Sequence, residues 1–276
     1  MKTIAAAILL VAGFTNLFAE SETWPVYAFQ NGVHFKSAEE RVKVLKELGY
    51  DGIGAARVND ALSLPQRLKL YDEAGLKLFS FYVGGRLEPK GHNYSKEISQ
   101  AIKDLKGRDV ILELYVQGNK KANTDKQAVA FVREIADQAK ESGLRIVLYP
   151  HTGFYVDTLG TAVRVARKCD RDNVGVMFNL CHYLMVEPKT DLKAVLTDAK
   201  PLLWQVSTCG AEQGGSDWSQ LIQTLDRGSY DQAALFKLLR ELGFKGNVGF
   251  QCYAIRGDSR DNLKRSIGAW NKLHFQ

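Results

Sequence analysis

The feature that most constrains the fold is a regular alternation of short apolar runs with longer stretches of helical period. Eight runs rich in Val, Ile, Leu, Phe and Tyr are expected to form buried strands: VYAF (26–29), DGIGA (51–55), LKLFSFYV (76–83), VILELYV (110–116), LRIVLYP (144–150), VGVMF (174–178), LLWQVS (202–207) and NVGFQCY (247–253). Apolar strands that alternate with amphipathic helices are typical of a parallel sheet covered on both faces. The chain is therefore expected to be an α/β protein.

The stretches between these runs carry helical signals. Eight helices are predicted, over residues 37–49, 65–75, 95–107, 125–143, 158–169, 191–199, 230–243 and 259–274. Ser37 and Glu40 have the spacing of a capping box at the start of the first helix. Glycine tolerates the left-handed backbone that ends a helix, so glycines that close these stretches act as stop signals. They are Gly49, Gly75, Gly107, Gly143 and Gly243.

Eight strands and eight helices fit a closed (β/α)8 barrel, which takes roughly 250 residues. An open doubly wound sheet would normally carry a glycine-rich phosphate loop after its first strand, and VYAFQNGVHF is not such a loop. KELGYDGIG near the start is echoed by RELGFKGNVGF near the end, which suggests a repeated helix-to-strand unit. No linker or low-complexity segment divides residues 20–276. A single TIM barrel domain is therefore predicted.

The N-terminus is predicted to be a signal peptide. Met1-Lys2 is followed by the apolar run IAAAILLVAGF and a small residue at Ala19, the pattern of a secretory signal over residues 1–19. The run is shorter than the roughly 20 residues of a membrane span, so stable membrane insertion after cleavage is not expected. The mature barrel, residues 20–276, is therefore expected to be exported, either periplasmic or secreted.

Composition excludes some classes of function. The sequence is 45% hydrophobic and 25% charged, which is ordinary for a globular protein. The net charge of +6 is spread among residues of both signs, without a polybasic run with interleaved aromatics, so nucleic-acid binding is not expected. The four cysteines match no CxxC-type zinc site, and buried free thiols are favoured. A bridge among Cys181, Cys209 and Cys252, which follow neighbouring strands, stays open as an alternative.

Barrel enzymes place their chemistry at the carboxyl ends of the strands. The polar residues predicted at these ends are Arg57, Arg86, Glu113, Gln117, Tyr149, His151, Asn179, His182, Ser207, Glu212, Gln251, Tyr253 and Arg256. Two long glycine-rich loops, 84–95 and 209–229, follow strands on the same face and could wall or cover a pocket.

Two histidines at adjacent strand ends give the strongest functional signal. His151 and His182 titrate near neutral pH, so they can pass protons or ligate a metal. The Glu113 side chain is predicted either to face polar company in the pocket or to pair with a neighbouring Lys or Arg, because a buried carboxylate without a partner is costly.

These motifs resemble a known family. LGYDGI after the first helix, LYPHTG at 148–153 and VGVMFNLCH at 174–182 are similar to the xylose isomerase-like barrels, the sugar phosphate isomerases/epimerases, which include a branch of abasic-site endonucleases. The resemblance runs over nearly the whole mature chain. It implies a divalent metal at the barrel mouth, held by a glutamate, an aspartate, a histidine and a second glutamate at four successive strand ends.

This sequence departs from the family pattern at each ligand. Tyr149 or Pro150 stands at the first position, Asn179 at the second, Ser207 or a neighbour at the third and Gln251 at the fourth. An amide keeps the outline of a carboxylate but loses the charge that holds a hard cation, so the usual metal site is expected to be lost. A displaced zinc or manganese ion held by His151, His182 and Glu113 is kept as an alternative.

The resemblance implies a carbohydrate-active enzyme that transfers a proton next to the carbonyl of a sugar or sugar derivative, and the predicted signal peptide implies that it is exported. His182, His151 and Glu113 are the candidate catalytic residues. The candidate substrate-binding residues are Asn179, Gln251, Arg57, Tyr149, Tyr253 and Arg86. Export argues against phosphorylated intracellular substrates and against DNA repair. Two alternatives remain: a lyase or hydratase acting on a keto-sugar glycoside, and a sugar-binding barrel without catalysis.

Overall fold

Eight parallel strands close into a barrel. The structure, a computed structural model, describes residues 24–56 and 61–274. The barrel strands are β1 (Val26–Phe29), β2 (Gly52–Ala56), β3 (Lys77–Glu88), β5 (Ile111–Gln117), β6 (Arg145–Leu148), β7 (Val174–Asn179), β8 (Leu203–Thr208) and β9 (Asn247–Phe250). Each pairs in parallel with its neighbour, β1 pairs with both β2 and β9, and β2 pairs with β3, so the ring is closed. The predicted barrel is confirmed.

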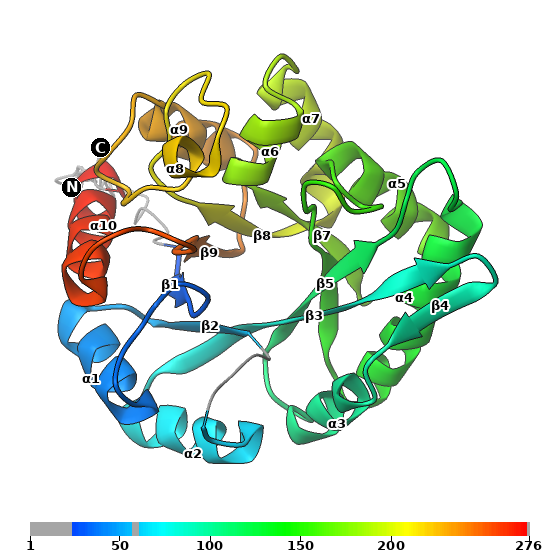
Figure 1. Ribbon diagram of the computed structural model, residues 1–276, viewed down its shortest axis with the longest axis horizontal. Coiled ribbons are helices and arrows are strands. Elements are labelled where there is room, and N and C mark those ends of the chain that lie inside the picture. Colours follow the sequence, from blue (N-terminus) through cyan, green and yellow to red (C-terminus); the bar gives the residue numbers. More distant parts are fainter. Residues whose placement is uncertain (1–23, 57–60, 275–276) are drawn as a thin grey trace, which may run out of the picture.

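The helices surround this barrel (Figure 1). They are α1 (Ala38–Leu48), α2 (Leu64–Ala74), α3 (Glu97–Asp104), α4 (Asp125–Glu141), α5 (Leu159–Cys169), α6 (Leu180–Val186), α7 (Leu192–Ala199), the 3-10 turn η1 (Lys200–Leu202), α8 (Trp218–Leu221), α9 (Gln232–Glu241) and α10 (Ser259–His274). The eight predicted helices are all present. The short helices α6 and α8 were not predicted, because each has too few residues to show a helical period.

The predicted helix boundaries are confirmed with one correction. All five stop-signal glycines have a positive φ, between 62° and 84°. Ser37 caps α1 by accepting a hydrogen bond from the Glu40 N–H, but the Glu40 carboxylate accepts from the N–H of Lys36, one residue before the position that a capping box requires. Full capping boxes instead start α2 at Ser63 and α4 at Thr124.

The sequence echo corresponds to two equivalent units on either side of β1. Gly49 ends the helix before β2, and Gly243 ends the helix before β9. In each unit the next aromatic residue, Tyr50 or Phe244, donates its backbone N–H to a carbonyl five residues back. β2 and β9 are also the two strands that pair with β1. The repeated helix-to-strand unit is therefore confirmed.

Residues 84–95 are not a loop, which corrects the sequence prediction. β3 runs on to Glu88, turns, and pairs in antiparallel fashion with β4 (Gly91–Tyr94). His92 and Tyr94 both bind the carboxylate of Glu134 on α4, at 2.7 Å and 2.5 Å. The hairpin therefore lies against the outer helix layer (Figure 1).

Large side chains inside the barrel stand opposite glycines. A Cβ atom on Gly54 or Gly249 would lie within 2.4–2.7 Å of atoms of the Tyr27 ring or of Ser80 Oγ. Cβ contacts this short are not tolerated in a packed interior. The apolar strands thus keep glycines where the Tyr27 ring crosses the barrel.

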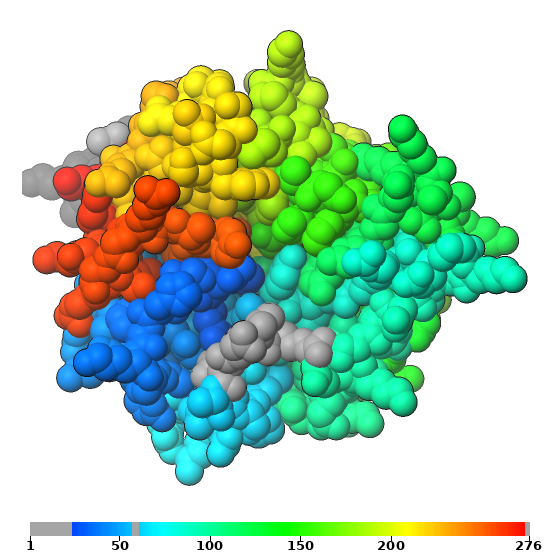
Figure 2. Space-filling model, viewed as in Figure 1, coloured from blue at the N-terminus to red at the C-terminus, as the bar shows by residue number. Residues whose placement is uncertain are grey.

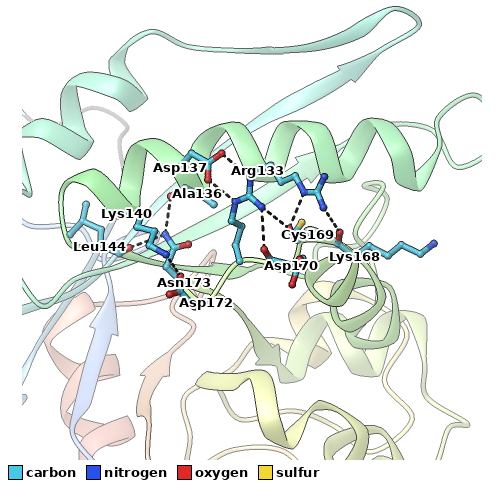
Figure 3. A network of polar contacts seen from close by, with 11 residues as sticks. Arg133, Ala136, Asp137, Lys140, Leu144, Lys168, Cys169, Asp170, Asp172 and Asn173 are labelled. Atoms are coloured by element: carbon cyan, nitrogen blue, oxygen red, sulfur yellow. Dashed lines mark hydrogen bonds and ion pairs between the residues drawn. The ribbon is translucent and has the colours of Figure 1, made fainter.

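An array of polar contacts joins α4 to α5 and to the turn before β7 (Figure 3). Arg133 donates hydrogen bonds to the carbonyls of Cys169 and Lys168, at 2.9 Å and 3.1 Å. The buried amide of Asn173 donates to the carbonyls of Ala136 and Leu144. The bonds of Arg133 satisfy carbonyls at the end of α5, and those of Asn173 join α4 to the residue before β6, so together they fix these helices against the barrel.

The four cysteines are free and buried in the structure. The bridge that the sequence left open among Cys181, Cys209 and Cys252 is therefore absent. Among the described residues, no helix is long and apolar enough to cross a membrane.

Candidate active site

A cavity of about 410 Å³ opens at the carboxyl ends of the strands. Its lining comes from β1 and β3 and from the segments that follow β1, β6, β7, β8 and β9. The lining residues are Phe29, Asn31, Tyr82, Tyr149, His151, His182, Trp218, Ile222, Gln251 and Tyr253. Figure 2 shows the segments after β8 and β9, in yellow and orange, beside the blue segment after β1. None of these ten residues is Asp, Glu, Lys or Arg. The described lining is therefore neutral, aromatic and polar.

Two imidazoles lie together in this cavity. The ring centroids of His151 and His182 are 4.4 Å apart, and His151 stacks on Phe154 with centroids at 4.0 Å. Thr152, in the loop after β6, links His151 to His182 through hydrogen bonds. Its N–H and its hydroxyl both lie within hydrogen-bond distance of His182 Nδ1, at 3.2 Å and 3.0 Å. Its carbonyl oxygen lies 2.9 Å from His151 Nδ1.

The backbone of Thr152 assigns opposite tautomers to the two rings. A backbone N–H can only donate, so His182 Nδ1 must accept and the proton of this neutral ring resides on Nε2. A backbone carbonyl can only accept, so His151 carries its proton on Nδ1 and keeps a lone pair on Nε2. The site thus holds one imidazole donor and one imidazole acceptor.

Burial keeps both rings neutral near pH 7. Together with a smaller contribution from the neighbouring His151, it lowers the pKa of His182 to about 3. Burial also lowers the pKa of His151, although the hydrogen bond to the Thr152 carbonyl opposes this shift. The site therefore contains a neutral base and a neutral donor in contact range, without a charged group between them.

Gln251 is fixed as an amide with a known orientation. Its Oε1 accepts the backbone N–H groups of Cys252 and Tyr253, at 3.1 Å and 3.2 Å, so Nε2 points the other way and donates to the Tyr149 hydroxyl at 3.3 Å. Burial raises the pKa of Tyr149, which keeps this hydroxyl protonated. Asn179, at the end of β7, has a buried Nδ2 with no hydrogen-bond partner among the described residues. Tyr149 and Gln251 line the cavity and can donate to the oxygens of a ligand, whereas Asn179 is not among the lining residues.

Glu113 points into the barrel interior and does not line the cavity. Its Oε1 accepts a hydrogen bond from the Tyr27 hydroxyl at 3.0 Å, and Gln205 in turn donates to that hydroxyl. Burial raises the pKa of Glu113 to about 7. The Glu113 carboxylate therefore lies among polar groups, as one of the two predicted environments requires, but these groups lie inside the barrel beneath the pocket and not in the pocket itself. The predicted alternative of a pairing Lys or Arg is wrong.

The structure brings together most of the predicted site residues. His151, His182, Tyr149, Gln251 and Tyr253 line the cavity, and Asn179 is buried at the end of the strand between the two histidine loops. Arg86 does not join them: it is exposed on the hairpin strand opposite Asn93. Arg57 lies outside the described residues.

Five lining residues were not predicted from the sequence. Phe29 ends the first strand, Asn31 follows it, Tyr82 lies in the third strand, and Trp218 and Ile222 belong to the segment 209–229. The prediction that this loop could wall a pocket is confirmed, whereas the same prediction for 84–95 is wrong. Four of these five residues are apolar or aromatic, so polarity at a strand end does not mark them; for Asn31, Trp218 and Ile222 the place after a strand was a usable signal.

A larger, open hollow of about 1040 Å³ lies outside the barrel mouth, between the segment 225–233 and α10. Its acidic and basic side chains partly neutralise each other, as in the pair of Asp226 with Arg265 at 2.8 Å. Of these two hollows, the smaller is the one that several buried polar side chains line, namely Tyr149, His182 and Gln251, so that cavity is the candidate active site.

The match to a protein family agrees with this geometry. The family described as Xylose isomerase-like TIM barrel matches residues 42–273, which is most of the chain. The protein belongs to this family. No curated protein sequence matches the chain.

Solved structures of xylose isomerase-like and related barrels superpose over nearly the whole chain. The 3-keto-D-glucoside 4-epimerase YcjR from E. coli has a TM-score of 0.70 and 18% identity, over 92% of this chain and 100% of that one. D-allulose 3-epimerase from Methylomonas sp., in complex with D-allulose, has a TM-score of 0.72 and 15% identity, over 91% and 97%. The IolI protein with a bound zinc atom has a TM-score of 0.73 and 15% identity, over 91% and 98%. At these identities the likeness shows the fold.

The residues at the family's metal positions do not fit a divalent cation. At Gln251 the only oxygen of the amide is already occupied by two backbone N–H groups. At Asn179 the oxygen accepts from the Cys181 thiol at 3.2 Å, and the unpartnered atom is an N–H donor, which repels a cation. Hard divalent cations need oxygen ligands with negative charge.

The alternative metal site is not assembled either. Among residues 24–56 and 61–274, no three His, Cys, Asp or Glu side chains are grouped so that they could hold a metal ion. His151 and His182 lie together, but the Glu113 carboxylate is bound to Tyr27 inside the barrel. The predicted trio of His151, His182 and Glu113 is therefore wrong as a ligand set.

Proposed function

We propose that this protein is an exported enzyme that moves a proton at the carbon next to the carbonyl of a neutral sugar or sugar derivative. The chemistry is that of an isomerase or epimerase. The lining is neutral among the described residues, which supports an uncharged ligand, because a phosphate or carboxylate would need a cationic partner when it leaves water. The family, and relatives described as 3-keto-D-glucoside and D-allulose epimerases, support a sugar. Export rests on the signal pattern of residues 1–19, which lie outside the described residues.

The observation that carries the proposal is the pair of complementary imidazoles set by Thr152. His151 Nε2 has the lone pair that removes the proton, and the Thr152 carbonyl at Nδ1 stabilises the imidazolium that forms. Electrons of the broken C–H bond move onto the carbonyl oxygen, which accepts a hydrogen bond from His182 Nε2–H. A neutral imidazole with a lowered pKa is suited to this role, because its N–H polarises a carbonyl without transferring a full charge.

Return of the proton decides the product. Delivery from the His151 imidazolium to the same face of the same carbon regenerates the substrate. Delivery to the opposite face of that carbon, after the intermediate turns over in the cavity, gives the epimer. Delivery to the former carbonyl carbon gives an isomer, and the proton of the neighbouring hydroxyl then passes to the former carbonyl oxygen. The Tyr149 hydroxyl, which lines the cavity, is a further donor for the hydroxyl and carbonyl oxygens of the substrate. Each of these steps uses only residues of this chain, and none needs a metal ion.

The test is proton exchange in D2O. Purified mature protein is dialysed against EDTA and incubated with a panel of neutral ketoses and keto-glucosides, and NMR follows the replacement of the carbon-bound proton next to the carbonyl. We expect exchange with at least one neutral sugar, at a rate that EDTA leaves unchanged. Loss of exchange on EDTA treatment and its return with Mn²⁺ or Zn²⁺ would contradict the metal-free route. Saturable binding to the whole panel without any exchange would instead favour a sugar-binding barrel.

A further inference from the structure

Exposed aromatic side chains gather at one place on the described surface. Trp218 and Tyr253 are the two large hydrophobic side chains that are exposed there, at 37% and 51%, and both line the candidate cavity. Exposed aromatic surface beside a cavity typically marks a place where a ligand completes the packing. They come from different loops, after β8 and after β9.

Both side chains are held by ordered backbone. Asp217 caps the short helix α8 by accepting hydrogen bonds from the N–H groups of Ser219 and Gln220, at 2.8 Å and 3.2 Å. This cap fixes the backbone of Trp218, the first residue of the helix. The indole then meets the His182 ring edge-on, with centroids 5.2 Å apart. The Tyr253 N–H donates to Gln251 Oε1, and the next residue, Ala254, adopts a left-handed φ of 56°. The rim is thus prepared before a ligand arrives, which lowers the entropic cost of binding.

The cavity has two chemically different levels. The inner level contains the buried polar groups Tyr149, His182 and Gln251, where the proposed proton transfer takes place. The outer level contains Trp218, Tyr253 and the exposed amide of Asn31, and none of these three carries a charge. Trp218 meets His182 at the boundary between the two levels, and the exposed parts of Trp218 and Tyr253 extend the aromatic lining outward from the inner polar groups.

We infer that the rim is a subsite for a second neutral ring, so that the substrate is a glycoside of the reacting sugar and not a free monosaccharide. This inference rests on the proposed function for the identity of the inner ring. The second ring packs its apolar face against Trp218 and Tyr253, and the glycosidic bond passes outward from the inner level. A sugar and an aryl aglycone both present such a face, and binding experiments can separate them.

The experiment measures binding, which does not require turnover. Full mature protein is titrated with methyl β-D-glucopyranoside, phenyl β-D-glucopyranoside, cellobiose and maltose, and the affinities are obtained by NMR. The same titrations are made with Trp218→Ala, Tyr253→Ala and the conservative Trp218→Phe. His151→Gln serves as the matched control inside the cavity, because it changes the proposed base and leaves the rim intact.

We expect at least one two-ring ligand to bind about tenfold more tightly than the methyl glycoside, which is the size of effect that burying part of an aromatic side chain gives. This preference is lost in Trp218→Ala and Tyr253→Ala, is largely kept in Trp218→Phe, and is unchanged in His151→Gln. A preference for phenyl over both disaccharides assigns an aryl aglycone, and the reverse assigns a second sugar.

Equal binding of one-ring and two-ring ligands, or a preference that survives both alanine variants, would overturn the subsite. Absence of saturable binding for every two-ring ligand would overturn it as well. The outcome of the proton-exchange assay does not depend on these binding results. Failure of the subsite and failure of the proposed function are therefore distinguishable. Exchange with a free ketose in a protein without two-ring preference would keep the enzyme and remove the subsite.

Discussion

Replacement of His151 by glutamine is expected to lower the rate of proton exchange about a thousandfold, the usual contribution of a positioned general base. Glutamine is similar in reach but has no basic nitrogen, so the variant can still bind the ligand. His182→Gln is expected to lose less than His182→Leu, because a glutamine N–H can partly replace the His182 Nε2–H that holds the developing oxyanion. Exchange rates in D2O and ligand affinities, measured side by side, separate chemistry from binding.

His92→Gln is the matched control for this substitution. His92 also follows a barrel strand in the sequence, but its ring is bound to Glu134 on the outer helix α4. We expect the exchange rate of this variant to equal that of the unchanged protein. Exchange that survives in His151→Gln, or that falls equally in His92→Gln, would remove His151 from the role of base.

The protonation state of His151 sets the direction in which the exchange rate depends on pH. His151 must be neutral to accept a proton, and burial lowers its pKa below the ordinary value of 6.5. The exchange rate is therefore expected to rise with pH through an apparent pKa below 6.5, and to be level at neutral pH. This acid limb should be absent from the residual activity of His151→Gln.

Replacement of Glu113 by glutamine is expected to stabilise the folded protein by about 3 kcal/mol at about pH 8. The Glu113 carboxyl is buried inside the barrel, and no Lys or Arg is among the residues that shift its pKa, which burial raises from 4.5 to about 7. Glutamine keeps an oxygen that can accept from the Tyr27 hydroxyl. Its amide N–H groups can also donate to Ser80 Oγ and Gln205 Oε1, two buried atoms without partners among the described residues.

The sign of the effect follows from proton binding. Between pH 4.5 and about 7 the folded state holds a proton on Glu113 that the unfolded state has released, so the stability of the unchanged protein falls as pH rises through this window. Below the window both states are protonated and the penalty is absent. The difference between Glu113→Gln and the unchanged protein should therefore grow from near zero to its full size across the window.

Urea unfolding at a series of pH values measures this difference. Glu141→Gln, a change at an exposed carboxylate on α4, is the control and is expected to shift stability little at any pH. A difference for Glu113→Gln that does not change with pH would contradict the raised pKa. Destabilisation across the whole range would show that the carboxylate is needed for the barrel core.

The barrel was predictable because its signals are local and repeated. Gly49 and Gly243 end helices by the same left-handed turn, and each precedes a strand beside β1. The hairpin was missed because its glycine-rich sequence, GGRLEPKGHNYS, reads as a loop. Only the pairing of β3 with β4, and the binding of His92 and Tyr94 to Glu134, show that it is ordered and points away from the site.

The candidate site was predictable in part. His151 and His182 were identified from their place at adjacent strand ends, and the structure places their rings 4.4 Å apart. Their tautomers could not be predicted, because they depend on the direction in which the Thr152 peptide points. The sequence could not show that Glu113 lies beneath the pocket. Residues on one strand alternate between the barrel interior and the helix layer, but this alternation does not encode how deep along the barrel axis a residue lies.

The central claim is that the site holds two neutral imidazoles in opposite tautomers, and long-range ¹H–¹⁵N correlation of ¹⁵N-histidine-labelled protein tests it directly. At about pH 7 we expect the His151 signal to show the proton on Nδ1 and the His182 signal to show it on Nε2, assigned with the two glutamine variants. The His182 signal should stay neutral on acidification until well below the ordinary range, since burial lowers its pKa to about 3. Two rings in the same tautomer, or a charged His182 at neutral pH, would contradict the proposed division into base and donor.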